Sequence, residues 1–536
     1  MEARALSRFR SQFSHTFPCS TNHNAPLFSF QPKSLQTNIK LLQPNILRFR
    51  PHGVSPATAN TAPIDADDEV QSEDDKFDWY SHWYPLAPVS DLDKRVPHAK
   101  TVLGIDVVLW WDRSEEKWKV FEDMCPHRLA PLSQGRIDNL GRLQCVYHGW
   151  CFDGNGNCKL IPQAPRDGPE IHTSKKACTS VYPCFQQNKI VWFWPNSDPK
   201  FKDISLTNKP PTIPGLDDPS FSSVLGIRDI SYGYDILIEN LLDPSHVQYA
   251  HYGIMKLRDN PDKIDREGGK PLDMTVQVLN SSGVQGKNGL NFIRFIAPCI
   301  ISMFPQSLDE RSNPSESILE EDPYGSSQMN KRMICLVFIC IPVSPGRSRL
   351  IWSFPRNFAI WADRILPPWI FHISQNLVLD SDLYLLHLEE KKISKIGNAQ
   401  WQKACFVPTK ADAFVTSFRK WLSKYSNCEV GWKNISNLDL PTPSSKEQLM
   451  ERYYSHVVQC RSCNSALKGL KILEVILQVL PIASIGILAA VKQNVLSSAA
   501  RNAVVLAAVL CFLASRWLSN FIYKTFYFHD YNHALK

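Results

Sequence analysis

The sequence predicts an α+β protein that consists of a small antiparallel β domain, a larger α+β domain and a C-terminal hairpin of two membrane helices. Three observations lead to this prediction. Short β-rich runs, separated by Gly, Pro, Asn and Asp, fill residues 79–200. Residues 201–455 mix strand-like runs with long helical runs. Two apolar runs of helical length then lie within residues 471–525.

The composition is that of a large globular protein with reduced cysteines. At 536 residues the chain is too long for one ordinary core, and 43% hydrophobic with 21% charged residues excludes a disordered chain. The net charge of +7 is spread among many acidic residues, so no nucleic-acid partner is expected. Fifteen cysteines, an odd number without a secretory signal, argue against a disulfide scaffold. We expect free thiols, a subset of which binds metal.

Residues 1–64 have the composition of an organelle transit peptide. Glu2 is the only acidic residue among many Arg, Ser, Thr, Asn and Pro, and no long apolar run is present. A disordered tail is the alternative. The charge reverses in residues 65–78, which we interpret as an acidic linker. The mature protein is therefore expected to begin near this linker.

The elements of the two domains follow from local patterns. Met333–Val343 and Arg349–Phe354 flank a Ser-Pro-Gly-Arg turn and predict a hairpin. Pro367 and Pro368 open a long helical run to about Lys395, and Gly397 is its stop signal. In the first domain the expected strands are Gly104–Trp111, Lys117–Asp123, Arg142–Phe152 and Asn188–Pro195.

The C-terminal region predicts two membrane spans, with residues 526–536 as a short tail after them. Val475–Val491 carries no formal charge, and Ala503–Phe521 is apolar apart from Arg516, Ser and Asn520. The second run spans only if Arg516 extends its guanidinium to an interface. A buried or interfacial helical hairpin is the alternative. Two spans would return the chain to the side from which it started.

The strongest motif for chemistry is Cys125-Pro-His127 followed, after seventeen residues, by Cys145-Val-Tyr-His148. Thiolates and imidazoles are both metal ligands, and two such loops can close around one metal centre. Zinc held by two Cys and two His is one interpretation. One Cys and one His in each half also suit a two-iron, two-sulfur cluster, in which thiolates hold one iron and imidazoles the other.

A second motif predicts a mononuclear iron site. His246 and His251 follow Glu239-Asn-Leu-Leu-Asp-Pro-Ser, and two imidazoles with one carboxylate form a facial triad for ferrous iron. Their spacing places them off one face of a regular helix, so a local break is expected. The carboxylate must come from downstream, from Asp380 or Asp382.

The choice between the two aspartates depends on their helical neighbours. Those of Asp380 include the polar residues Asn376 and Tyr384. Asp382 is therefore expected to be the more buried, and a buried carboxylate needs a cation. We predict Asp382 as the ligand. The neighbours of Asp382 are Val378, Leu379, Leu385 and Leu386, all apolar.

The flanks of the first motif decide between zinc and iron. The segment CPHRLAPLSQGRIDNLGRLQCVYHGWCF closely resembles the Rieske domain of ring-hydroxylating-type oxygenases. The resemblance implies that residues 79–200 form a Rieske [2Fe-2S] domain. Residues 201–455 would then form a helix-grip-like catalytic domain with mononuclear Fe(II) that reacts with O2. By the same resemblance the cluster ligands are Cys125 and Cys145 on one iron and His127 and His148 on the outer iron.

The resemblance also assigns a role to Asp243. In the family, an aspartate three residues before the first iron-binding histidine connects that ligand to a cluster histidine of a neighbouring subunit. Electrons would thus pass from His127 or His148 through Asp243 to the iron at His246. This route implies a homotrimer. Trp150 would shield the cluster or simply pack in the core.

Longer blocks resemble one plant group of Rieske-type non-haem iron oxygenases, that of pheophorbide a oxygenase and chlorophyllide a oxygenase. They include DWYSHWYPLAPVSDLDKRVPHAK, YGYDILIENLLDPSHVQYAHYG and FIYKTFYFHDYNHA, and they are most similar to the branch with the protochlorophyllide-dependent translocon component. The resemblance implies a chloroplast transit peptide, a multi-pass protein of the inner envelope (or thylakoid), ferredoxin as donor and association with a protein-import translocon.

The substrate implied is a tetrapyrrole, protochlorophyllide a, with a ring methyl oxidised to formyl. Ring opening of pheophorbide a and a non-catalytic redox or pigment-sensing translocon subunit are the alternatives. Within the segment 456–470, Cys460 and Cys463 fit the group's CxxC, regarded as a thioredoxin target. The alternative is two free thiols.

Overall fold

The computed structural model describes residues 76–165, 167–255, 264–305, 332–433, 440–442, 444–492 and 495–535. The transit peptide predicted for residues 1–64 and most of the acidic linker lie outside these ranges.

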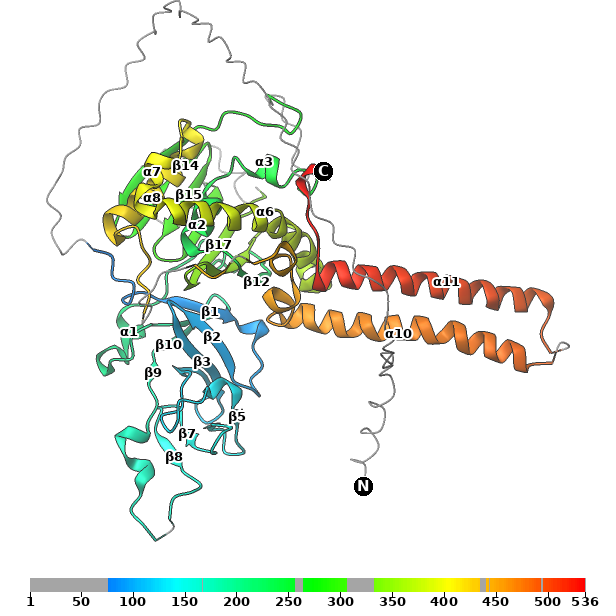
Figure 1. Ribbon diagram of the computed structural model, residues 1–536, viewed down its shortest axis with the longest axis horizontal. Coiled ribbons are helices and arrows are strands. Elements are labelled where there is room, and N and C mark those ends of the chain that lie inside the picture. The colour runs from blue at the N-terminus through cyan, green and yellow to red at the C-terminus, as the bar shows by residue number, and fades with distance from the viewer. Residues whose placement is uncertain are drawn as a thin grey trace, which may run out of the picture. The chain divides into compact units, whose positions relative to one another are not determined.

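The first domain consists of short antiparallel strands in three sheets (Figure 1). The strand orders are β1-β11-β10, β2-β3-β4-β9 and β5-β6-β7-β8. The sequence predicted a β-rich domain here from runs of branched and aromatic residues between Gly, Asn and Asp turns, and the three sheets confirm it. The strands are β1 (Tyr84–Pro88), β2 (His98–Val102), β3 (Ile105–Asp112), β4 (Lys117–Glu122), β5 (Arg136–Ile137), β6 (Leu143–Gln144), β7 (Cys151–Phe152), β8 (Cys158–Leu160), β9 (Val181–Tyr182), β10 (Cys184–Gln187) and β11 (Ile190–Phe193).

For one predicted strand of this domain, the prediction is wrong for the central residues. The run Arg142–Phe152 divides into β6 and β7, and residues 145–150 form a loop between them. The loop turns because Gly149 adopts a positive φ of 76° and donates its N–H to the Cys145 carbonyl at 3.1 Å. The loop buries Cys145 but exposes Val146 and Tyr147, so the apolar residues of this run do not belong to one long strand.

The second domain is built on a seven-stranded antiparallel sheet of order β12-β18-β17-β16-β15-β14-β13. The predicted hairpin is confirmed: β17 and β18 pair up to Ser344 opposite Arg347, around the Pro345-Gly346 turn. The strands are β12 (Leu225–Ile230), β13 (Met274–Asn280), β14 (Gly283–Asn288), β15 (Asn291–Ile296), β16 (Ile300–Pro305), β17 (Leu336–Ser344) and β18 (Arg347–Ser353).

Helices cover this sheet and bring the candidate site to it. Helix α2 contacts β17, α6 contacts β12, and α8 contacts β13 and β14. The long predicted helix is confirmed as α6, which ends where Gly397 adopts a φ of 93°. The helices of the domain are α1 (Ile204–Thr207), α2 (Tyr234–Leu242), α3 (Val247–Ala250), α5 (Ile360–Ile365), α6 (Pro368–Ile396), α7 (Trp401–Ala404), α8 (Ala413–Ser426) and α9 (Lys446–Leu449).

The first described residues pack on the second domain. The Phe77 ring lies 5.1 Å from that of Trp421, and the Trp79 ring lies 5.6 Å from that of Tyr234. The Phe77 N–H also donates to the Tyr425 carbonyl at 2.8 Å. The chain thus contacts the second domain before it enters the first, so one continuous core joins the two domains.

Two long helices, α10 (Arg461–Ala490) and α11 (Ser498–Ile522), form the C-terminal hairpin (Figure 1). Both are long and apolar enough to cross a membrane. Large apolar side chains such as Ile482 and Leu506 are exposed along them, 75% and 61% respectively. A core helix of a soluble domain would bury such side chains, so this pattern favours a lipid environment. Arg516 is exposed near the end of α11 that joins the second domain.

Candidate metal centres

Two loops of equivalent geometry present the first Cys/His motif. The Cys125 N–H donates to the Ala130 carbonyl, and the Cys145 N–H donates to the Trp150 carbonyl, both at 2.9 Å. The cysteines are 2% and 1% exposed, and each lies at the start of its loop. The two loops therefore present their thiols from matching positions, as a shared metal cluster requires.

The two histidines of these loops lie together on the more exposed side. The rings of His127 and His148 are 4.4 Å apart, and Trp150 stacks on His127 at 4.7 Å with an interplanar angle of 6°. The Nδ1 atom of His127 is buried and has no hydrogen-bond partner among the described residues. A buried ring nitrogen of this kind suits a metal ligand. Trp150 thus covers one face of a candidate ligand.

The electrostatics of the thiols agree with this donor set. Burial, together with the neighbouring Cys145, raises the pKa of the Cys125 thiol to about 12. A thiolate in this position needs a positive charge beside it, which two iron ions supply. The residues present therefore fit a [2Fe-2S] cluster.

The second motif lies at a break between two helices, as predicted from the histidine spacing. Helix α2 ends at Leu242, and the short α3 follows His246 and ends just before His251. The rings of these histidines are 5.1 Å apart. Asp382 on α6 joins them, with Oδ2 3.7 Å from His251 Nε2. One donor atom of each of the three residues lies within 4.8 Å of the others, as in a facial triad.

Asp380 and Asp382 are both buried, at 0% and 5% exposure, so the expected difference in burial was the wrong reason for choosing between them. The two aspartates differ in the side chains that they contact. Asp380 forms ion pairs with Arg228, at 2.7 Å, and with Arg452. Asp382 instead faces His246 and His251, and burial raises its pKa to about 7. Its charge is left for a bound cation to neutralise.

Two further side chains orient the histidines. The Ser381 hydroxyl donates to the Val378 carbonyl at 2.6 Å, so at 2.7 Å from His251 Nδ1 its oxygen accepts the ring N–H. The Nε2 lone pair of His251 then points toward Asp382. Asp243 Oδ2 lies 3.5 Å from His246 Nδ1, and the Asn240 amide Nδ2 lies 3.4 Å from Nε2 of the same ring, so a metal at Nε2 would take the place of this amide contact.

Replacement of Ser381 by alanine should weaken Fe(II) binding. The hydroxyl fixes the tautomer of His251, and loss of such support typically costs about 10–100-fold in metal affinity. Equilibrium titration of iron-depleted protein with Fe(II) measures this. Ser374→Ala, on the exposed side of α6, is the matched control and should leave the affinity unchanged. Equal affinities for the two variants would show that Ser381 does not orient the ligand.

The segment after the hairpin returns to this site, which the sequence did not predict. His533 Nε2 lies 2.9 Å from the Ser381 carbonyl, and the Tyr531 hydroxyl donates to the Ala250 carbonyl at 3.5 Å. Tyr531 is 4% exposed. Residues beyond α11 therefore pack against both the helix that carries Asp382 and the turn that carries His251.

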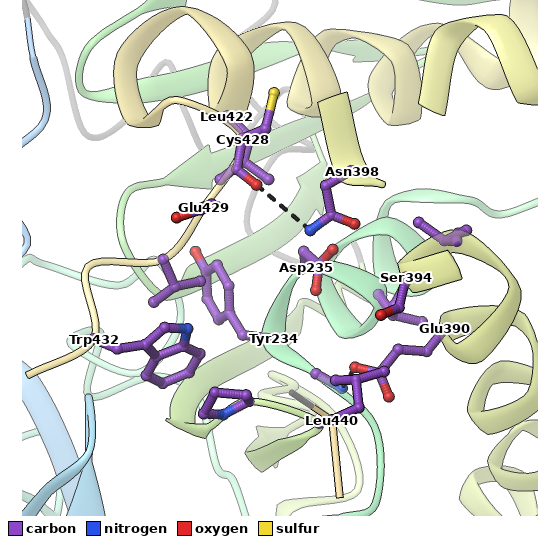
Figure 2. A pocket seen from close by; sticks show the side chains of 16 residues that line it. Tyr234, Asp235, Glu390, Ser394, Asn398, Leu422, Cys428, Glu429, Trp432 and Leu440 are labelled. Carbon is purple, nitrogen blue, oxygen red and sulfur yellow. Dashed lines mark hydrogen bonds between the residues drawn. The ribbon is translucent and has the colours of Figure 1, made fainter. Parts of the chain in front are cut away.

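A separate pocket lies at the far ends of α2 and α6 (Figure 2). Tyr234 and Asp235 from the start of α2 line it, together with Glu390 and Ser394 from the end of α6. Figure 2 shows Asn398 bonded to the Cys428 carbonyl across one side. His246, His251 and Asp382 are not among its lining residues, so this pocket is distinct from the candidate iron site.

A Rieske-type loop pair followed by a two-histidine, one-carboxylate site defines the class of Rieske non-haem iron oxygenases. Comparison with known proteins agrees with this definition. Residues 82–183, which contain the first motif, match the Rieske [2Fe-2S] domain family. Residues 295–400, which contain Asp382, match the pheophorbide a oxygenase family.

Relatives that match this chain along most of their length show which branch of this class it resembles. The chain is 52% identical to the protochlorophyllide-dependent translocon component 52 of Arabidopsis thaliana, over 97% of this chain and 96% of the relative. It is 51% identical to flavonoid 8-hydroxylase 2 of Ocimum basilicum, over 87% of each. It is 36% identical to pheophorbide a oxygenase of Oryza sativa subsp. japonica, over 89% of each. All three are described as chloroplastic.

This chain belongs to the chloroplast family of Rieske-type oxygenases that includes pheophorbide a oxygenase. Family membership implies a [2Fe-2S] cluster and a mononuclear iron that reacts with O2. The crystal structure of dicamba monooxygenase bound to dicamba shows the same fold, with a TM-score of 0.50 and 22% identity, over 66% of this chain and 98% of that one. The predicted α+β fold with a Rieske domain is therefore confirmed.

Proposed function

We propose that this protein is a membrane-anchored chloroplast oxygenase that oxidises a ring methyl of protochlorophyllide a to formyl. The observation that carries the oxygenase assignment is the position of Asp382 beside His246 and His251 in a chain that also carries a Rieske domain. The relative named for its dependence on protochlorophyllide, at 52% identity, supports the substrate. The two apolar helices support a membrane anchor, which we propose lies in the inner envelope.

Each residue of the two motifs has a role in this proposal. Cys125, Cys145, His127 and His148 would hold the cluster, and His246, His251 and Asp382 would hold ferrous iron. When bound, these metals supply single electrons and the activation of O2. Asp243 holds the ring of His246, and Ser381 holds the tautomer of His251. Trp150, stacked on His127, and the buried core around the thiols would exclude water from one side of a bound cluster.

The proposed partners follow from the family. Ferredoxin would donate electrons, and a homotrimer would bring Asp243 to a cluster histidine of the neighbouring subunit. Asp243 suits this contact because its side chain remains 26% exposed while it holds His246. The names of the translocon component and of protein TIC 55 of Pisum sativum, 28% identical, support an association with protein import. A fully active monomer, by measured mass, would contradict the trimer.

Asp243→Asn should lower turnover per bound iron by about 10–100-fold while the cluster content stays at the wild-type level. The asparagine keeps the shape of the side chain but loses the charge that holds His246 and faces the neighbouring subunit. Stopped-flow reoxidation of the pre-reduced cluster, with substrate and O2, measures the effect. The exposed Asp203→Asn is the control. Wild-type rates in Asp243→Asn would remove Asp243 from the pathway.

A second candidate function is hydroxylation of a flavonoid ring. It is favoured by the 51% identity to a flavonoid 8-hydroxylase, which nearly equals the identity to the translocon component. Ring opening of pheophorbide a has weaker support, at 36% identity. A non-catalytic redox or pigment-sensing subunit is disfavoured, because such a subunit has no need for a two-histidine, one-carboxylate site.

One experiment separates these functions. Purified protein, reduced without oxygen, is mixed with protochlorophyllide a, a flavone or pheophorbide a, and isotopically labelled O2 is then admitted. Label in a formyl product supports the first proposal, label in a hydroxyflavone the second, and label in an opened macrocycle the third. Absence of label in every product, from protein with full metal content, would overturn the oxygenase assignment.

A further inference from the structure

A second group of metal-binding side chains lies outside both motifs. His372, His456, Cys460 and Cys463 bring one donor atom each to within 4.8 Å of the others. All four are buried, with exposures of 1%, 2%, 1% and 3% respectively. They come from α6, from the short π-helix η10 (Tyr453–Val457) and from the start of α10. The group therefore lies where the chain leaves the second domain for the hairpin.

The separations within the group match a tetrahedral metal site. His372 Nδ1 lies 3.5 Å from Cys460 Sγ and 3.4 Å from Cys463 Sγ. His456 Nε2 lies 3.2 Å from Cys463 Sγ. In a tetrahedral zinc site, with bonds of about 2.3 Å to sulfur and 2.0–2.1 Å to nitrogen, a sulfur and a nitrogen are roughly 3.5 Å apart. Three of the six separations are thus close to those of a tetrahedral site, and the other three lie within 4.8 Å.

The tautomers of both histidines are set for metal binding. His372 Nε2 lies 3.2 Å from the Leu225 carbonyl, and His456 Nδ1 lies 2.6 Å from the Ile227 carbonyl. Carbonyls only accept, so each of these nitrogens carries the ring proton. The other nitrogen of each ring, the one that faces the sulfurs, therefore carries a lone pair. A backbone carbonyl behind the ring is the usual support of a metal-bound histidine.

We propose that His372, His456, Cys460 and Cys463 bind one structural zinc ion that fastens the membrane hairpin to the catalytic domain. Two sulfur and two nitrogen donors form one of the usual structural zinc sets. Because all four residues are buried, the site has no open position for water or substrate. The ion would join β12, through the two carbonyls, to α6 and to the first turn of α10.

This site competes with the redox role predicted for the CxxC. Cys460 and Cys463 cannot both bind zinc and be joined in a disulfide. Their exposures of 1% and 3% also place both thiols out of reach of a reductase such as thioredoxin unless this junction opens. Thioredoxin regulation stays a prediction, and the experiment below decides between the two.

The test uses the full-length protein, purified in detergent without oxygen. Elemental analysis should find about one zinc per chain besides the iron. X-ray absorption spectroscopy at the zinc edge should show two sulfur neighbours at about 2.3 Å and two nitrogen neighbours at about 2.0–2.1 Å. Zinc with only nitrogen and oxygen neighbours would indicate an ion at His246 and His251 instead, and would overturn the proposal.

Substitutions of the proposed ligands test which residues bind the zinc ion. Cys463→Ser and His372→Gln should each lower the zinc content at least about tenfold and leave the visible spectrum of the cluster unchanged. Cys405→Ser, a partly exposed cysteine outside the group, should keep the full content. Wild-type protein that lacks zinc, with both thiols alkylated as free or joined by a disulfide in its mass spectrum, would overturn the proposal even if a variant failed to fold.

Discussion

Replacement of Asp382 by asparagine is expected to abolish turnover and to leave the visible spectrum of the Rieske cluster unchanged. The carboxylate faces the two histidines, and the described residues give it no ion pair with an arginine. Burial raises its pKa to about 7, so a cation is needed to keep it ionised. Asparagine removes that charge and one iron ligand. The loss should exceed the roughly 100-fold effect of residues that only support a ligand. His246→Ala should likewise abolish turnover and leave the cluster spectrum unchanged, because it also removes an iron ligand.

Three measurements on the same preparation check this prediction: product formation, iron per chain and the cluster spectrum. Iron content should fall by about one ion per chain while the cluster signal remains. Glu389→Gln makes the same chemical change at an exposed position of α6 and should be active. Loss of the cluster signal in Asp382→Asn would show that the two metal sites had been confused.

Replacement of Asp380 by asparagine should instead destabilise the protein by about 3–5 kcal/mol. Asp380 is fully buried and neutralises two buried guanidinium groups, those of Arg228 on β12 and Arg452 before η10. Arg452 also donates to the Lys524 and Thr525 carbonyls, at 3.0 and 3.2 Å. Asparagine would leave two buried positive charges without a counter-charge, which costs far more than the loss of one surface ion pair.

Denaturant unfolding in detergent, followed by bleaching of the cluster and by circular dichroism, measures the effect. Asp380→Asn that still folds should retain its iron, because Asp382 is unchanged. The outcome thus separates two neighbouring aspartates: one variant loses iron at near-normal stability, and the other loses stability with its iron in place. Iron loss in Asp380→Asn without a change in stability would reverse these roles.

The sequence predicted these aspartates as alternatives but could not describe their surroundings. Helical neighbours of Asp382 are apolar, and from this we expected it to be the more buried of the two. That expectation was wrong because Asp380 is buried against Arg228 and Arg452. These arginines are 152 and 72 residues away in the chain, and only the fold brings them next to Asp380. Partners this distant leave no trace in local periodicity.

Local signals were more reliable where local physics decides the structure. Gly397 ends α6, and the Pro345-Gly346 turn closes the β17–β18 hairpin, because each residue type has the backbone geometry that the position needs. The CxxC was recognised as a pair, yet His456 precedes Cys460 by four residues, a spacing that could have suggested a metal site. His372 lies 88 residues from Cys460, and only the fold brings them together.

The return of the chain from α11 to the iron site imposes an order on biogenesis. Tyr531 and His533 pack beside the ligands, and they follow both hairpin helices in the chain. The ribosome must therefore complete both helices before the segment that covers the site is made. A chain that is arrested or clipped between α10 and α11 lacks this segment, which leaves the wall of the oxygenase centre unfinished. Maturation of the oxygenase is thus coupled to completion of its own C-terminal hairpin.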